Sequence, residues 1–264
     1  MFVKDVRLQI ALTLGAIAVI SLIRFFSLTI LLSFIISLVG TLLIESLFLY
    51  FTKKKIFLSY SAIITGLLIF LIWQSDSLWT YLLAAVLAIS SKYILKLGPK
   101  HIFNPAAFGL LTSSIITGTP VAWWGASWNI LLILILYIGT LPVLKRLRRL
   151  YIVGGFLLFY FIFSILTTQN IQTIQFLIDG TVILFALIML PEPQTSPISG
   201  HWLKKFGVYV ALIMIVLINV LKYLPNINID PLLLSLLIGD LLSVLLIKLQ
   251  SRPITIPPPT QNVS

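Results

Sequence analysis

Long apolar stretches separated by short polar loops dominate the sequence. A helix that crosses a bilayer needs about 20 apolar residues, with a working range of about 17–25. On this criterion the sequence predicts ten apolar segments, at about residues 8–23, 25–51, 56–73, 78–95, 104–118, 128–144, 150–167, 173–190, 206–224 and 231–248. The fifth segment is short enough to be a half-helix or a tilted insert. The pattern predicts an all-α, multi-pass membrane protein.

The basic residues test this count, because cytoplasmic loops of membrane proteins carry an excess of Lys and Arg. With the N-terminus in the cytoplasm and sides alternating, sixteen of the eighteen basic residues fall inside. They are Lys4, Arg7, Lys53, Lys54, Lys55, Lys92, Lys96, Lys100, Lys145, Arg146, Arg148, Arg149, Lys204, Lys205, Lys248 and Arg252. Arg24 and Lys222 fall outside. We therefore expect both termini in the cytoplasm and the protein in the inner (cell) membrane of a prokaryote.

Composition agrees with this class. Hydrophobic residues make up 59% of the chain and charged residues 9%, whereas soluble domains carry about 25% charged residues. We expect one membrane domain over residues 1–251, followed by a disordered, Pro-rich tail over residues 252–264. The net charge of +11 is explained by loop charge that fixes orientation. The expected partner is thus the lipid bilayer, and no nucleic acid is expected.

Several kinds of chemistry are excluded or restricted. The chain has no cysteine, so it cannot form disulfides, thiolate-held clusters or cysteine nucleophiles. A haem held by two histidines would require His101 and His201, both expected in loops, to meet. No phosphate loop, G-x-G-x-x-G or H-E-x-x-H pattern is present, and we expect neither catalytic residues nor a metal site.

Two pairs of short motifs indicate an internal repeat. Asn104-Pro105 opens the fifth segment and Asp230-Pro231 opens the tenth, each as an N-cap residue followed by Pro at the first helical position. Thr65-Gly66 in the third segment and Gly180-Thr181 in the eighth lie at corresponding depths. Because five segments make each half, the second half runs in the opposite sense, as an inverted repeat. The halves are about residues 1–122 and 123–251. Ordinary N-caps and packing glycines are the alternative.

Three acids lie inside predicted segments: Glu45, Asp179 and Asp240. Burying a carboxylate in hydrocarbon is costly unless it is paired, protonated or facing water, so these residues are candidates for an ion or proton pathway. Glu45 could instead lie within reach of Lys53 to Lys55. Asp240 could instead be a protonated donor in a helix–helix hydrogen bond. Asp179 directly precedes the Gly180-Thr181 break.

The segment Leu190–His201 is rich in proline and polar residues. Its three prolines disfavour helix and hold an extended path. Glu192, Thr195 and Ser196 supply hydrogen-bond donors and acceptors beside the cytoplasmic interface. A plain connector is the alternative.

Aromatic and basic residues mark the two membrane surfaces. The expected outer side gathers Trp73, Trp79, Trp123, Trp124 and Trp128. They are typical of an interfacial aromatic belt, with a stacking platform for a ring-shaped ligand as the alternative. The run from Lys145 to Arg149 is expected to anchor the inner side, or alternatively to attract anionic lipid or an acidic partner.

An ordered set of motifs covers about residues 40 to 200. It comprises Glu45, Ser61-Ala-Ile-Ile-Thr-Gly-Leu-Leu68, Lys92, His101-Ile-Phe-Asn-Pro-Ala-Ala-Phe-Gly109 and Asp179-Gly-Thr-Val-Ile-Leu-Phe-Ala-Leu-Ile-Met-Leu-Pro-Glu-Pro-Gln-Thr-Ser-Pro197. In order and spacing the set resembles the RnfD/NqrB family. Its members are the membrane subunits of the Rnf complex and of the sodium-pumping NADH:quinone oxidoreductase. The resemblance implies ten helices in two inverted halves, related to urea and ammonium channels.

The resemblance also implies a function. The chain would be an integral membrane subunit of a flavin-dependent electron-transport complex, carrying electrons across or along the membrane, with coupling to Na⁺ or H⁺ movement. Its partners would be other membrane and soluble subunits, and its cofactor FMN or riboflavin, bound non-covalently. The residues expected to bind it are Thr65, Gly66, Asn104, Pro105, Gly109, Gly180, Thr181, Glu192, Thr195 and Ser196.

The sequence also departs from the family. Family members usually attach a flavin to a Thr in an S-G-A-T-type motif. Here the nearest remnant is Trp124-Gly-Ala-Ser-Trp128, with Ser127 in place of the Thr, so we do not expect covalent flavin there. The family's T-D-P appears as Leu190-Pro-Glu-Pro193, and the chain is short, as a reduced, divergent member would be. Two alternatives stay open: a channel or transporter for a small solute without redox activity, and a structural membrane anchor for a soluble reductase.

Overall fold

The computed structural model describes residues 5–53, 59–98, 100–125, 129–168, 179–197, 200–224 and 228–250. Regular structure in this part of the chain is almost entirely helical, with ten α-helices, one π-helix and one hairpin of two short strands. Each of the ten segments expected from the hydrophobic pattern contains a helix. The described structure therefore agrees with an all-α, multi-pass fold.

The first five helices are α1 (Val6–Arg24), α2 (Leu28–Lys53), α3 (Tyr60–Ile72), α4 (Trp79–Ile94) and α5 (Pro105–Thr117). Polar side chains begin three of them. Asp5, Ser59 and Asn104 each accept a hydrogen bond from a backbone N–H of the first turn, which satisfies a donor that the helix itself leaves open. A short antiparallel hairpin that the sequence did not predict joins α4 to α5. It consists of β1 (Lys96–Leu97) and β2 (Lys100–His101).

The second group of helices comprises α6 (Ile130–Arg146), α7 (Leu150–Thr168), α9 (Gly180–Leu184), the π-helix η1 (Phe185–Met189), α10 (Gly200–Leu221) and α11 (Pro231–Gln250). Residues 173–178 of the predicted eighth segment lie outside the described residues. The expectation that His201 lies in a loop was wrong, because α10 already begins at Gly200. Regular backbone hydrogen bonds extend α10 over the six residues 200–205 that precede the predicted apolar run from Phe206.

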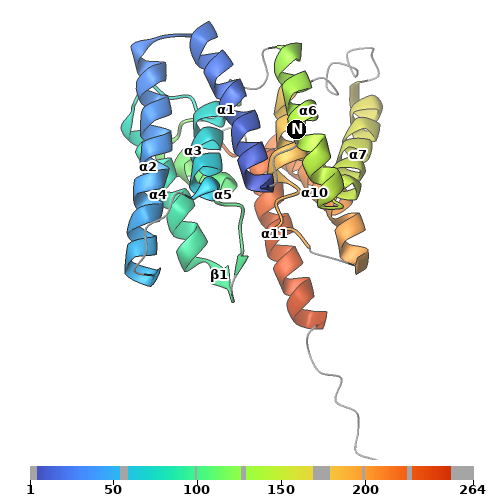
Figure 1. The fold of residues 1–264 in the computed structure, drawn as a ribbon. Helices are drawn as coiled ribbons and strands as arrows, with labels where there is room; N and C mark the ends of the chain where they lie inside the picture. The colour runs from blue at the N-terminus through green and yellow to red at the C-terminus, as the bar shows by residue number, and fades with distance from the viewer. Residues whose placement is uncertain are drawn as a thin grey trace, which may run out of the picture.

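The helices form two groups that meet along the middle of the molecule (Figure 1). In one group α2 packs against α3 and α4, and α4 packs against α5. In the other, α10 packs against α7 and α11. The groups contact each other through α1 with α6 and through α5 with α11. Buried apolar side chains from both groups make one continuous core.

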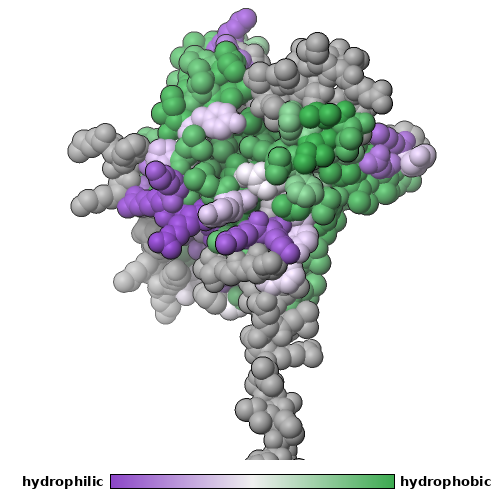
Figure 2. Space-filling model, turned by 90° about the vertical axis from the view of Figure 1, so that its right-hand side faces the viewer, coloured by the Kyte–Doolittle hydropathy of each residue, from purple (hydrophilic) through white to green (hydrophobic). Residues whose placement is uncertain are grey.

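The outer surface is largely apolar. Among the described residues, three helical stretches, Val6–Arg24, Leu28–Thr52 and Trp202–Leu221, are long and apolar enough to cross a membrane, and several shorter helices are also apolar. Figure 2 shows one face on which apolar side chains cover the upper part and most hydrophilic side chains form a band below them. This distribution is compatible with a protein whose sides face lipid.

The expected tryptophan belt is only partly observed. Trp79 is exposed, but Trp73 and Trp123 are buried. The indole N–H of Trp73 donates to Thr80 Oγ1 at 3.0 Å, so this ring belongs to the core. Trp128 lies outside the described residues.

Candidate functional site

Asn104 joins three helical elements at the start of α5. Its Oδ1 accepts from Ala107 N at 3.0 Å and caps α5, while Pro105 occupies the first helical position. Its backbone N–H donates to Asp240 Oδ2 on α11 at 2.8 Å. Its Nδ2 donates to the carbonyl of Met189, at the end of η1, at 3.3 Å. The cap therefore ties α5 to both α11 and η1.

Asp240 and the segment after η1 place polar atoms next to this cap. Asp240 is fully buried, and the Thr195 side chain lies close enough to interact with its carboxylate. Glu192 Oε1 lies 3.4 Å from His101 Nε2. We call Asn104, Glu192, Thr195, Ser196 and Asp240 the Asn104 junction.

Three buried oxygens of the Asn104 junction lack a hydrogen bond of good geometry among the described residues, although the Thr195 side chain lies beside the Asp240 carboxylate. They are Asp240 Oδ1, Glu192 Oε2 and Thr195 Oγ1. More than 90% of buried polar groups in proteins find a partner, so each exception requires an explanation. Carboxylate and hydroxyl oxygens of this kind can hold a proton or a hard cation.

The π-helix η1 leads directly into the polar segment 191–197. In η1 the Leu190 N–H donates to the Phe185 carbonyl at 3.0 Å, five residues back, and such widened turns are frequently found at functional sites. Pro191 follows and cannot continue a helical hydrogen-bond ladder. Pro193 has no N–H to donate to the Met189 carbonyl four residues back. This carbonyl accepts from Asn104 Nδ2 and, at 3.4 Å, from Glu192 N, and the chain turns into residues 191–197.

Hydrogen bonds fix the segment 191–197 from both sides. Ser243 Oγ on α11 donates to the Thr195 carbonyl at 2.9 Å. Ser196 Oγ donates to the Glu192 carbonyl at 2.5 Å and accepts from the Arg149 guanidinium. Polar atoms of the Asn104 junction are therefore held by α11 and by the loop between α6 and α7.

Two basic side chains shape the electrostatics at this end of the site. Burial lowers the pKa of the Arg149 guanidinium, and the Glu192 carboxylate partly opposes this shift. Burial, together with the nearby Arg149, lowers the pKa of Lys100 on β2. Sequence reasoning treated Arg149 as an orientation charge, but it is buried and positions Ser196. Its place at the end of a run of four cations gave no signal for this role.

Glu45 belongs to a separate polar group. Its Oε1 lies 2.6 Å from Lys92 Nζ on α4 and accepts from Ser59 Oγ at 3.2 Å. Lys92 Nζ also donates to Ser61 Oγ at 3.2 Å. The alternative partners considered from the sequence, Lys54 and Lys55, lie outside the described residues. Because α2 packs against α4, the nearest described cation is Lys92.

Of three predicted cofactor residues, Thr65 bonds within its own helix, and Gly66 and Gly109 lie against neighbouring helices. Thr65 Oγ1 donates to Ser61 O at 2.9 Å within α3. A Cβ at Gly66 would lie 2.6 Å from Thr41 Oγ1 on α2, and one at Gly109 would lie 2.5 Å from the Ala84 carbonyl on α4. Both glycines allow close helix packing. Thr65 and Gly66 do not interrupt α3, which is continuous from Tyr60 to Ile72.

Gly180 and Thr181 lie at the opposite end of their helix from Glu192. Asp179 Oδ1 accepts from Thr181 N at 2.9 Å and caps α9. The ten residues of α9 and η1 separate this cap from the Met189 carbonyl by about 15 Å of helical rise. Asp179 therefore starts a helix rather than lying within one. Ser127, the position considered for covalent flavin, lies outside the described residues.

A second capped helix start lies at Asp230. Asp230 Oδ1 accepts from Leu233 N and its Oδ2 from Trp123 Nε1, each at 2.8 Å. Nearby, Ser114 Oγ on α5 donates to Asn228 O at 3.1 Å, and Asn228 Nδ2 donates to Gly118 O at 2.8 Å. We call Ser114, Gly118, Trp123, Asn228 and Asp230 the Asp230 junction. Burial raises the pKa of Asp230, although the hydrogen bonds from Leu233 and Trp123 oppose the shift.

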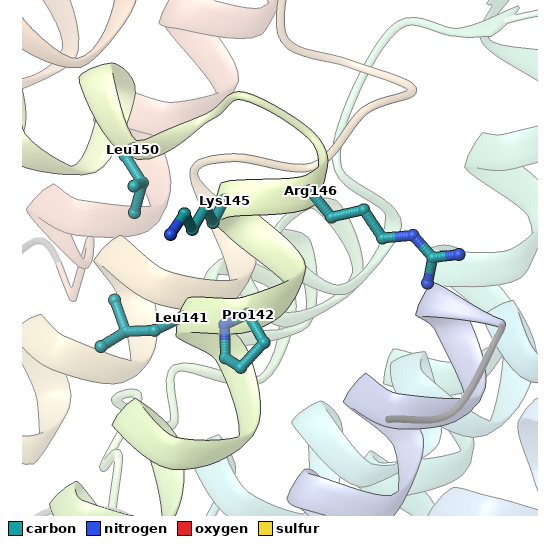
Figure 3. Close-up of a pocket in the computed structure, with 5 residues that line it drawn as sticks. All are labelled: Leu141, Pro142, Lys145, Arg146 and Leu150. Atoms are coloured by element: carbon teal, nitrogen blue, oxygen red, sulfur yellow. The ribbon is translucent and has the colours of Figure 1, made fainter. Parts of the chain in front are cut away.

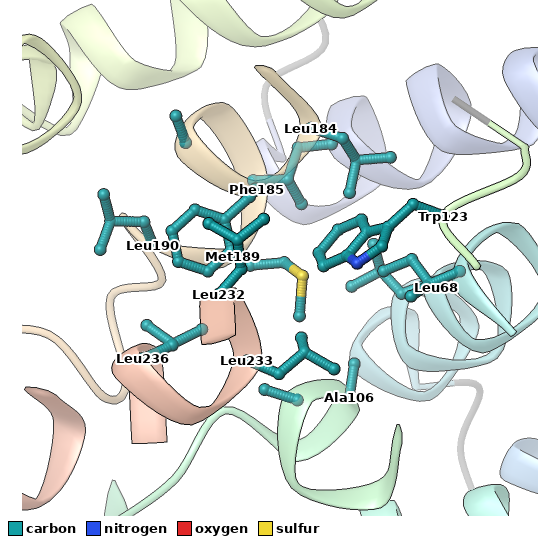
Figure 4. Close-up of a cluster of buried hydrophobic side chains, with 14 of the residues drawn as sticks. Leu68, Ala106, Trp123, Leu184, Phe185, Met189, Leu190, Leu232, Leu233 and Leu236 are labelled. Carbon is teal, nitrogen blue, oxygen red and sulfur yellow. The ribbon is translucent and has the colours of Figure 1, made fainter. Parts of the chain in front are cut away.

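Apolar side chains fill the space between the two helix groups. Leu68, Trp123, Phe185, Met189 and Leu233 converge from different elements (Figure 4) and are each at most 4% exposed. The Trp123 and Phe185 rings meet edge to face, with centroids 6.4 Å apart. The described centre is therefore a packed apolar layer, with the Asn104 junction beneath Met189.

The site does not resemble a transition-metal centre. Among the residues that the structure describes, no three His, Asp or Glu side chains come together. The unpartnered oxygens instead suit a proton or a small cation. A scan against protein-family models and a search of curated proteins found no match to this chain. The functional interpretation therefore rests on these residues and their geometry.

Proposed function

We propose that the two helix groups are the halves of an inverted repeat. The packing of one group recurs in the other: α4 on α5 corresponds to α10 on α11, and α2 on α4 corresponds to α7 on α10. Likewise α1 contacts α3, and α6 contacts α9 and η1. The helices α5 and α11, which would be equivalent, both begin with a capping residue and Pro and contact each other.

The hydrogen bonds between α5 and α11 support the same symmetry. Asn104 at the start of α5 bonds Asp240, ten positions after Asp230 on α11. Ser114, ten positions after Asn104 on α5, bonds Asn228 just before the start of α11. Reciprocal contacts of this kind are expected where two equivalent helices cross about a two-fold axis.

This repeat would cross the inner membrane of a prokaryote, with the Asn104 junction toward the cytoplasm and both termini inside. The charge asymmetry of the loops supports this orientation, since sixteen of eighteen basic residues would face the cytoplasm. Cysteine labelling of the full chain at Ser77 and at Lys96 tests it. The two sites should react from opposite sides of the membrane, and labelling from the same side would overturn the orientation.

The function that the geometry supports best is passage of a proton or Na⁺ through the Asn104 junction. We propose that the chain does this as an RnfD/NqrB-like subunit of a flavin-dependent electron-transport complex. The observation that carries the proposal is the group of three buried, unpartnered oxygens of Asp240, Glu192 and Thr195. An ionisable group at membrane depth is costly to keep unless function requires it.

The residues that the family resemblance would give to a flavin do not form one cradle. Gly66 and Gly109 face α2 and α4 at contact distance, and Gly180 begins a helix about 15 Å of rise from the Asn104 junction. We therefore assign no electron-transfer step to these side chains. Flavin carried by a partner subunit would satisfy the proposed role, because redox chemistry belongs to the cofactor and not to the chain that couples to it.

The decisive experiment reconstitutes the purified chain in proteoliposomes and measures Na⁺ and H⁺ flux under an imposed gradient. The expected result is a flux that Asp240→Asn abolishes and Asp76→Asn, an exposed loop control, does not change. Flux that both variants leave intact would overturn the assignment. A visible spectrum of the same preparation, before and after denaturation, reports whether the chain itself carries flavin.

A small-solute or cation transporter without redox partners is the second candidate. One observation favours it: the residues that the resemblance would give to a flavin do not form one cradle, since Gly66 and Gly109 face α2 and α4 at contact distance. Affinity purification from the native membrane separates the candidates. Co-purifying redox subunits favour the electron-transport complex, and a solitary chain that still conducts ions favours the transporter.

A further inference from the structure

A surface cavity of about 660 Å³ lies where α6 ends and α7 begins. Its lining residues are Leu141, Pro142, Lys145, Arg146 and Leu150. Leu141 and Leu150, each 41% exposed, form apolar walls on either side of the Lys145 side chain (Figure 3). The cavity thus combines an apolar groove with an ammonium group at its polar end.

The apolar wall continues along the outside of α6. Leu134 and Ile138 are exposed on the same helix, seven and three positions before Leu141 respectively, and such spacing places side chains on one helix face. A hydrocarbon chain could therefore lie along Leu134, Ile138 and Leu141 and end at Lys145. This arrangement of apolar and basic side chains suits a phospholipid, with the acyl chain along α6 and the headgroup at the loop.

The basic residues at the polar end of the cavity favour an anionic ligand. Lys145, Arg146 and Arg148 lie within four residues of one another, and no described acid forms an ion pair with Lys145. The guanidinium of Arg146 points away from Lys145 and Leu150 in Figure 3, so Lys145 is the group placed to contact a headgroup. The first turn of α7, which has no acidic residue, starts at Leu150 and adds the partial positive charge of a helix N-terminus.

We propose that this cavity binds an anionic phospholipid, with its phosphate at Lys145 and one acyl chain between Leu141 and Leu150. Basic pockets between helix ends at a membrane surface are suited to such headgroups. The site lies on the opposite side of α6 and α7 from the core helices and shares no residue with the Asn104 junction. It requires only that this end of α6 lie at a membrane surface, so it does not depend on ion transport.

The test uses the full chain, extracted in mild detergent and mixed with phosphatidylglycerol or phosphatidylcholine at equal concentration. Native mass spectrometry counts the lipids that each sample retains. The unmodified chain should retain phosphatidylglycerol at least threefold better than phosphatidylcholine. Equal retention of the two lipids would overturn the proposal.

Two variants and one control locate the site. Lys145→Gln should remove most of the preference for phosphatidylglycerol, while Lys96→Gln, an exposed lysine of the β1–β2 hairpin, should leave it unchanged. Leu141→Trp keeps the charge but fills the groove, so it should lower retention of phosphatidylglycerol as well. A loss of the same size in Lys96→Gln, or unchanged retention in Leu141→Trp, would show general surface attraction and overturn the site. A thermal melt of each sample confirms that the variant is folded.

Discussion

The Asn104 junction and the Asp230 junction are built from the same parts but differ in how well their polar atoms are satisfied. Each begins a helix with a capping side chain followed by Pro, and each contains a carboxylate, which is fully buried at Asp240 and partly buried at Asp230. Both oxygens of Asp230 accept hydrogen bonds. One oxygen of Asp240 accepts a hydrogen bond, and the other lacks one of good geometry among the described residues.

The difference separates a structural acid from a candidate functional one. A buried carboxylate whose oxygens are all occupied stabilises its surroundings and leaves no place for a ligand. Asp240 instead has a carboxylate oxygen without a hydrogen bond, next to similar oxygens of Glu192 and Thr195. Burying such a carboxylate costs free energy unless it binds a proton or a cation. The comparison therefore predicts that changes at Asp240 affect activity and changes at Asp230 affect stability.

The largest expected effect concerns Glu45, a buried acid with a charged partner. Lys92→Met leaves the Glu45 carboxylate without the ammonium 2.6 Å away. Removing one partner of a buried ion pair costs about 3–5 kcal/mol, so the variant should unfold at markedly lower temperature in detergent. The double variant Glu45→Gln, Lys92→Met should recover most of this loss. If the single and double variants melt alike, the pair does not stabilise the fold.

The next effect tests the functional side of the comparison. Asp240→Asn keeps the size of the side chain and the acceptor for Asn104 N but removes the group that can bind and release a proton. We expect at least a hundredfold loss of ion flux, or about 2.7 kcal/mol in the barrier, with a small change in melting temperature. Asp230→Asn is the matched control and should retain flux, because Asn is also a good N-cap. Equal flux in both variants would remove the distinction between the two junctions.

The next prediction concerns the contribution of Asp230 to the stability of the fold. Asp230→Ala removes the α11 cap, worth about 1 kcal/mol, and leaves the Trp123 indole N–H without its acceptor, at a cost of about 1 kcal/mol more. The expected destabilisation is thus about 2 kcal/mol. In Trp123→Phe the second cost is absent, so the two substitutions together should destabilise less than the sum of the single changes. Strict additivity in a double-mutant cycle would show that the Trp123–Asp230 bond contributes nothing.

The hydrophobic pattern was sufficient to predict most helices, because apolar runs of membrane length admit few other structures. The N-caps at Asn104 and Asp230 could also be predicted from the sequence, since Asn-Pro and Asp-Pro at the start of an apolar run are local signals. The contact between Asn104 and Asp240 was not, because it joins residues 136 positions apart and depends on how α5 crosses α11. For the same reason the sequence could not show that Arg149 reaches Ser196 or that Glu45 meets Lys92.

Glycines gave the least reliable guide to the site. Gly66 and Gly109 were expected to line a cofactor, but a Cβ at either position would collide with a neighbouring helix. A glycine that lets two helices approach and a glycine that lets a ligand approach have the same sequence signature. The irregular backbone lies instead at η1, where Phe185–Met189 contains no glycine at all, so composition gave no sign of it.

The smallest effect concerns the charge of Asp230 itself. An unfolded Asp loses its proton near pH 4, whereas burial raises the pKa of Asp230 in the folded protein. Between these two pKa values the folded state binds more protons than the unfolded state, so this group makes stability fall as pH rises. The melting temperature should therefore drop as the pH rises above about 4, and Asp230→Asn should flatten that drop. Asp76→Asn, an exposed outer-loop control, should leave the drop unchanged. An unaltered pH dependence in Asp230→Asn would mean that the hydrogen bonds from Trp123 and Leu233 outweigh burial, which would make Asp230 a charged cap and widen its contrast with Asp240.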